Sequence, residues 1–166
     1  MISHVNIIDL IREPMQTTAW TVLLILNALW FGLGAFHFSL KPAASARSLV
    51  PRDQRASPLF RTLSDSIRFL GGLNFALMAL CAMLLVFAGF FPEARQRVLF
   101  AAVIALAHAS QFAVNVPMIG KWRRNEPGAW RVLEGSMLFI FATDGALMVA
   151  NAVFGVWAFA GAPGGR

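Results

Sequence analysis

Four long apolar stretches constrain this 166-residue chain more than any other feature of its sequence. A helix needs about 20 apolar residues to cross the hydrocarbon core of a bilayer, and each stretch reaches that length. The stretches do not alternate as barrel strands do, so helices remain as the way to satisfy the backbone in lipid. The sequence therefore predicts an all-α, four-helix transmembrane bundle, a single integral membrane domain over residues 1–166. The expected helices lie near residues 18–40, 66–91, 97–119 and 135–160.

The composition agrees with a chain that is solvated by lipid. Hydrophobic residues make up 58% of the sequence and charged residues only 13%, against roughly 25% charged in soluble domains. The net charge of +6 would suggest a nucleic-acid partner in a soluble protein. Here the basic residues stand in short loops beside apolar stretches, so the charge predicts an orientation in the membrane and no nucleic-acid partner.

The basic residues are distributed unequally between the two sides of the predicted bundle. The first and third loops with their flanks carry ten cations: Lys41, Arg47, Arg52, Arg55, Arg61, Arg68, Lys121, Arg123, Arg124 and Arg131. The two tails and the second loop carry four: Arg12, Arg95, Arg97 and Arg166. Because cytoplasmic loops are enriched in Lys and Arg, we expect a multi-pass protein of the inner (plasma) membrane with both termini outside the cytoplasm.

Two further features bear on packing. The N-terminal segment 5–15 has a helical apolar pattern and is predicted to be either a short interfacial helix or a flexible tail.

Small residues at i, i+4 spacing let membrane helices approach closely, and they form two stripes in this sequence. The stripes are Gly72 with Ala76, and Ala101, Ala105, Ala109 and Ala113.

Polar residues inside the apolar stretches are the candidates for function, because ionisable groups there cost about 2.5–3.5 kcal/mol each on insertion scales. With the expected orientation, most of them fall in the cytoplasmic half of the bundle. The sequence predicts a polar cavity open toward the cytoplasm that binds a lipid-like or amphiphilic small molecule. Its candidate lining residues are His37, Arg68, Asn74, His108, Gln111, Asn115 and Asp144.

Asp144 is the central residue of this predicted cavity. Arg68 or a protonated His108 is its expected partner, and Asp144 with Arg68 could equally form a structural ion pair. Asn27 and Asn151 fall in the outer half and are predicted to serve as interhelical hydrogen-bonding residues. If all the polar residues serve only to hydrogen-bond between helices, the protein is expected to be an accessory subunit of a larger membrane complex or a homo-oligomer.

Redox chemistry is a third class of function to weigh. Two membrane histidines could ligate a haem, but His37 and His108 differ by about 10 Å in depth at 1.5 Å per residue. A metal site of His37, His108 and Asp144 has the same difficulty, so no metal is predicted and the cofactor stays open. The chain has no Gly-x-Gly-x-x-Gly, Walker A, His-Glu-x-x-His or Cys-x-x-Cys pattern, so the sequence leaves open whether it is an enzyme.

The stretch "RFLGGLNFALMALCAMLL" at 68–85 resembles the second helix of small DoxX-like membrane proteins. In that group of uncharacterised bacterial four-helix proteins, a basic residue precedes a Gly-Gly pair and an apolar span. Arg68, Gly71, Gly72 and Asn74 match this pattern, whereas Asp144 and the third loop do not. The resemblance implies a four-helix fold in a bacterial inner membrane. Some members of the group are linked to quinone redox systems, but this property is not carried over to a chain that has no cofactor motif.

Overall fold

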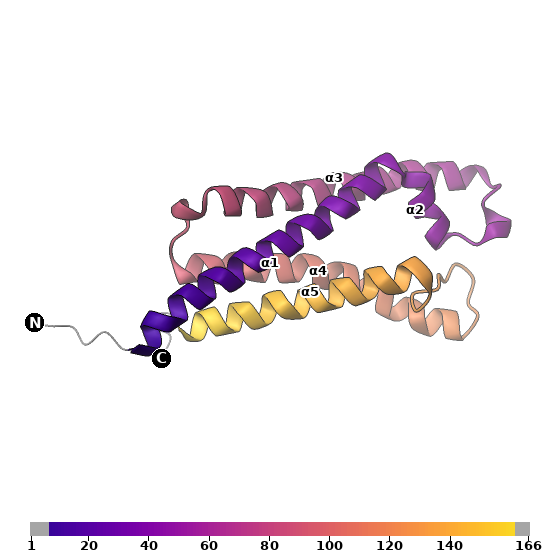
Figure 1. Ribbon diagram of the computed structural model, residues 1–166. Helices are drawn as coiled ribbons and strands as arrows, with labels where there is room; N and C mark the ends of the chain where they lie inside the picture. Colours follow the sequence, from indigo (N-terminus) through magenta and orange to yellow (C-terminus); the bar gives the residue numbers. More distant parts are fainter. Residues whose placement is uncertain (1–6, 162–166) are drawn as a thin grey trace, which may run out of the picture.

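The computed structural model describes residues 7–161, with side chains from residue 11 onward, and this part of the chain is all-α (Figure 1). The long helices are α1 (Ile7–Leu40), α3 (Pro58–Val86), α4 (Ala94–Arg123) and α5 (Gly135–Ala160). A short helix, α2 (Pro42–Leu49), and two single 3₁₀ turns, η1 (Arg52–Gln54) and η2 (Ala88–Phe90), lie in the connections.

Each long helix contains a segment that is long and apolar enough to cross a membrane: Ile11–Leu40, Pro58–Val86, Ala94–Arg123 and Gly135–Ala160. Large apolar side chains point outward along them, among them Leu29, Phe69 and Leu106, which are 67–85% exposed. Lipid tails solvate such side chains without cost. The prediction of an all-α, four-helix membrane bundle is confirmed, and the protein is a four-span integral membrane protein.

The helix ends differ from the predicted ones where capping residues decide them. α3 begins at Pro58 rather than near residue 66, because Ser57 accepts a hydrogen bond from the Leu59 N–H at 3.3 Å and proline suits the first helical position. At its other end α3 stops at Val86, and η2 occupies residues that were predicted to be helical.

The first helix is also longer than predicted. α1 runs without interruption from Ile7 through Pro14 into the membrane span, so residues 7–15 form neither a separate interfacial helix nor a flexible tail. Pro14 lies inside α1, and because proline has no backbone N–H, it removes one i→i−4 hydrogen bond without ending the helix. The rest of the predicted interfacial segment, residues 5 and 6, lies outside the described residues.

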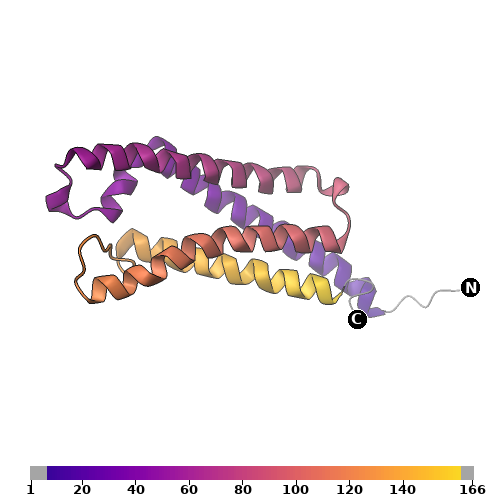
Figure 2. The ribbon, with the colours of Figure 1, turned by 180° about the vertical axis from the view of Figure 1, so that it is seen from behind.

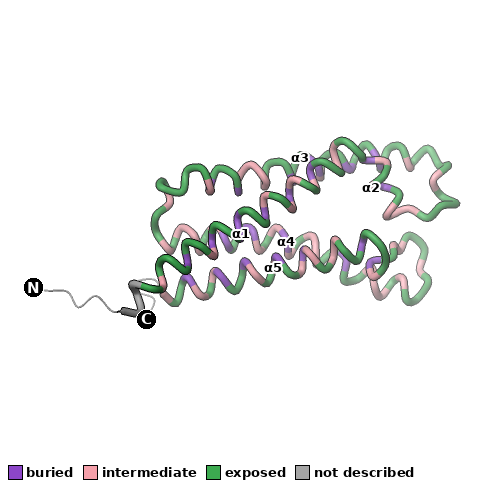
Figure 3. The backbone as a smooth tube through the Cα atoms, viewed as in Figure 1, coloured by how far each residue is buried: buried purple, intermediate pink, exposed green. Residues whose placement is uncertain are grey.

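The four long helices pack as two antiparallel pairs, α1 with α3 and α4 with α5 (Figures 1 and 2). α1 crosses the bundle diagonally, so that it also contacts α5. All four long helices contribute to one apolar core that includes Trp20, Leu24, Cys81, Ile104 and Phe154. Buried residues recur along each long helix between exposed ones, as Figure 3 shows.

Glycine allows a close approach between α1 and α3. A Cβ on Gly71 would lie 2.7 Å from the backbone nitrogen of Ser39 and would also overlap the Ser39 hydroxyl. A Cβ on Gly72 would meet nothing within 4 Å. The prediction that Gly72 belongs to the packing stripe is therefore wrong by one residue, since a shift of one position turns a helical side chain by about 100°.

The alanine stripe of α4 is only partly a packing surface. Ala101 is fully buried in the core, and a Cβ on Gly155 of α5 would lie 3.9 Å from its methyl group. Ala105 and Ala109 line a groove between α4 and α5, and Ala113 is exposed. The stripe drifts off the α5 contact because a repeat of four residues exceeds the 3.6 residues of a helical turn.

The first and third connections come together at one end of the bundle. Ala46 of α2 and Val132 of the third connection are both fully buried, and Ser48 hydrogen-bonds Ser136 of α5 at 3.2 Å. The ten cations counted above lie at this end or on its flanks. The first connection is therefore a folded cap on the bundle, not only the solvated basic loop that its composition indicates.

Candidate functional site

Asp144, in the middle of α5, is completely buried. One carboxylate oxygen, Oδ1, lies 3.0 Å from His108 Nδ1 of α4 and accepts a 2.9 Å hydrogen bond from Trp30 Nε1 of α1. Three helices therefore meet at this oxygen. The sequence offered Arg68 and His108 as partners of Asp144, and in the structure the partner is His108.

His108 is completely buried as well, and both of its ring nitrogens are engaged. Nε2 lies 2.8 Å from the Asn27 Oδ1 atom of α1, opposite the contact with Asp144. The imidazole stacks on Phe31, with ring centroids 4.7 Å apart and planes 12° from parallel. Contacts on both edges and one face fix the orientation of this ring.

The Asn27 and Asn151 amides extend the same chain of hydrogen bonds. They exchange two bonds of 3.2 Å, and each also donates to a carbonyl four residues earlier in its own helix, Leu23 or Leu147. We call the connected set the buried network: Asn27, Trp30, His108, Asp144 and Asn151. It joins α1, α4 and α5.

One atom of the network has no partner. The second carboxylate oxygen of Asp144, Oδ2, is buried and has no hydrogen-bond partner among the described side chains and backbone. Within residues 11–161, no other buried side-chain nitrogen or oxygen lacks a hydrogen-bond partner. Leaving such an atom unpaired costs about 1–3 kcal/mol, and more for a charged group.

The other predicted site residues divide into two groups. Asn74 and Asn115 are buried, but each donates to a carbonyl of its own helix, and Asn115 also accepts a 2.9 Å bond from Trp130. Gln111 is half-buried, and its backbone carbonyl accepts the bond from Asn115. These three residues do not join the buried network.

His37 and Arg68 are exposed and lie apart from the buried network, so their place in a cavity open toward the cytoplasm stays a prediction. Arg68 lies 3.8 Å from Asp65 on its own helix and has no contact with Asp144. Depth along a helix does not fix which face a residue occupies, and a long cationic side chain near a helix end reaches outward. Of the seven predicted residues, Asp144 and His108 are therefore the two that the described hydrogen bonds bring together.

Sequence reasoning missed Trp30 and set Asn27 and Asn151 apart from the site. Asn27 and Asn151 do bond across helices as predicted, but Asn27 also contacts His108 directly. The i, i+3 spacing of Asn27 and Trp30 places both on one face of α1, which is a signal that could have found the tryptophan.

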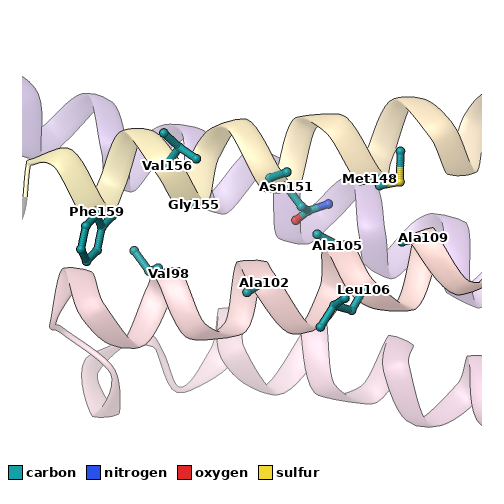
Figure 4. Close-up of a pocket in the computed structure, with 11 residues that line it drawn as sticks. Val98, Ala102, Ala105, Leu106, Ala109, Met148, Asn151, Gly155, Val156 and Phe159 are labelled. Carbon is teal, nitrogen blue, oxygen red and sulfur yellow. The ribbon is translucent and has the colours of Figure 1, made fainter.

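Two grooves lie on the bundle within the membrane-spanning helices, and none of the seven predicted residues lines either of them. The larger, of about 540 Å³, runs between α4 and α5 (Figure 4). Its lining is almost entirely apolar and includes Ala102, Leu106, Val156 and Phe159, together with Asn151. The smaller, of about 410 Å³, lies between α1 and α3.

The α4–α5 groove ends close to the buried network. Met148 and Ala109 line its inner end, and Met148 stands one helical turn from Asp144, whereas Ala109 follows His108 in sequence. Beyond this end Phe112 stacks on Phe141 and lies against Gly145, where an added Cβ would be 3.0 Å from its ring. On α5 the groove therefore leads from the termini end of the bundle to within about one helical turn of Asp144.

The pair of histidines that a haem would need is not assembled, because His37 is exposed and both ring nitrogens of His108 are already engaged. Within residues 11–161, no group of three or more His, Cys, Asp or Glu side chains gathers in a way that could hold a metal ion. No protein-family model, curated protein or solved structure matches the chain.

Proposed function

We propose that this four-span protein binds a long-chain amphiphile within the membrane, with its apolar chain in the α4–α5 groove and its polar end beside Asp144. The observation that carries the proposal is the buried, unpartnered Oδ2 atom of Asp144. Ionisable groups inside membrane spans are usually paired and mark functional sites. A hydrogen-bond donor on a ligand would supply the missing partner.

The groove supplies the other half of such a site. Its volume of about 540 Å³ falls in the usual range of small-molecule pockets, roughly 300–1,000 Å³. An apolar wall with a polar group at one end matches a molecule with a hydrocarbon chain and one polar end. A ligand of this kind would reach the groove sideways from the bilayer, since both helices that line the groove are long and apolar enough to span the membrane.

Filling the groove tests this function. Ala105 lines the groove and Ala113 lies two turns further along α4, exposed and outside it. Ala105→Phe should abolish the retention of a bound lipid-like molecule, measured by native mass spectrometry of protein released from detergent micelles. Ala113→Phe is the matched control and should retain the molecule as the wild type does. Equal retention by both variants, or none by the wild type, would count against the proposal.

We further propose that the end of the bundle formed by the first and third connections faces the cytoplasm of a bacterial inner membrane. Ten cations stand at this end against four acidic residues, Asp53, Asp65, Glu126 and Glu134, and cytoplasmic loops favour such an excess. The bacterial setting rests on the DoxX-like resemblance.

Cysteine labelling tests the orientation. In a Cys81→Ala background, Gly89→Cys and Gln54→Cys place single thiols at exposed positions on opposite ends of the bundle. A membrane-impermeant maleimide should label Gly89→Cys in intact spheroplasts and Gln54→Cys only after permeabilisation. The reverse labelling pattern would show that the protein has the opposite orientation in the membrane.

A further inference from the structure

The hydrogen bonds of Asn27 fix where one proton of His108 lies. The Asn27 Nδ2 group donates to the Leu23 carbonyl at 2.7 Å and to the Asn151 Oδ1 atom at 3.2 Å. The remaining amide atom, Oδ1, is therefore the oxygen, which can only accept. His108 Nε2 lies 2.8 Å from it, so Nε2 carries a hydrogen and donates.

The other side of the imidazole then holds a single shared proton. His108 Nδ1 and Asp144 Oδ1 are 3.0 Å apart, and one hydrogen between them makes the bond. Trp30 donates its own N–H to the same oxygen and adds no proton to the count. The pair is either imidazolium with carboxylate or neutral imidazole with carboxylic acid, and its net charge is zero in both arrangements.

A site with this charge selects among amphiphiles. An uncompensated charge in a completely buried, membrane-embedded position is strongly unfavourable. An ammonium or carboxylate end group would bring the same uncompensated charge. A hydroxyl group brings none, and it can donate its hydrogen to the unpartnered Oδ2 atom of Asp144.

We infer that the ligand class of this site is the uncharged long-chain alcohol, with its hydroxyl group donating to Asp144 Oδ2. This inference rests on the proposed function, because it concerns the polar end of a molecule whose chain lies in the α4–α5 groove. It assigns Asn27 and Asn151 as positioning residues, since the Asn27 amide oxygen, which also accepts from Asn151, accepts from His108 Nε2 and keeps a hydrogen on that nitrogen.

Thermal unfolding in detergent micelles tests the inference. Cys81, the only cysteine in the sequence, is completely buried, so a thiol-reactive dye reports its exposure as the protein unfolds. Dodecanol, dodecylammonium, dodecanoate and dodecane are compared at one mole fraction. Dodecanol should raise the Tm of the wild type above the value with dodecane, by about 5 °C at 100-fold excess over Kd, and the two charged compounds should not.

Variants assign this difference to the carboxyl group. Asp144→Asn should lose the advantage of dodecanol over dodecane. Asn115→Ala, which removes a buried amide outside the network, should keep it. A wild-type Tm that rises as much with dodecylammonium or dodecanoate would overturn the ligand class and leave chain binding intact. If none of the four compounds changes the Tm, the proposed function fails as well.

Discussion

Replacing His108 with leucine while Asp144 stays in place should lower the free energy of unfolding by about 3–5 kcal/mol. The substitution leaves a completely buried carboxyl group without its main partner and removes the ring that stacks on Phe31. Reversible unfolding in mixed micelles of a mild detergent and sodium dodecyl sulfate measures this loss.

The Asp144→Leu single variant and the His108→Leu/Asp144→Leu double variant complete the test. Because removal of both groups leaves no unpaired charge, the double variant should lose less stability than the two single variants together, by about 0.5–3 kcal/mol. Losses that simply add would show that the two side chains do not interact energetically, and the account of the buried pair would then be wrong.

The second large effect is expected at a glycine far from the network. Gly71→Ala should destabilise the protein by about 1–3 kcal/mol, because the new methyl group would overlap Ser39 and push α1 away from α3. The same unfolding titration measures the change.

Gly72→Ala is the matched control for this prediction. The neighbouring position is exposed, with open space where the Cβ would lie. The control variant should therefore be unchanged or slightly more stable, since alanine favours a helix by about 1 kcal/mol over glycine. Equal effects at the two positions would refute the close α1–α3 approach at Gly71.

The four-helix bundle could be predicted because long apolar stretches admit few other structures in lipid. The helix ends could be predicted only within several residues, because they depend on caps such as Ser57 with Pro58 and on the continuation of α1 through Pro14. Hydrophobicity carries no information on such local contacts.

The candidate site was predicted in part. Asp144 and His108 could be found because ionisable groups stand out in apolar sequence, and their pairing was one of the alternatives. Arg68 and His37 are exposed and do not join this pair, because depth along a helix does not show which side of the helix faces the bundle. The diagonal path of α1 brings Asn27 and Trp30 to α4 and α5, and no single-helix pattern reveals that crossing.

Photolabelling tests the central claim, an amphiphile with its polar end at Asp144 and its chain in the α4–α5 groove, most directly. Two long-chain alcohols are used, one with a diazirine beside the hydroxyl group and one with a diazirine at the far end of the chain. The first should label the inner end of the groove near Ala109 and Met148, and the second the outer end near Val98 and Phe159. Labels scattered over lipid-facing positions of all four helices would contradict the account. Labelling of the same residues by both probes would contradict it too.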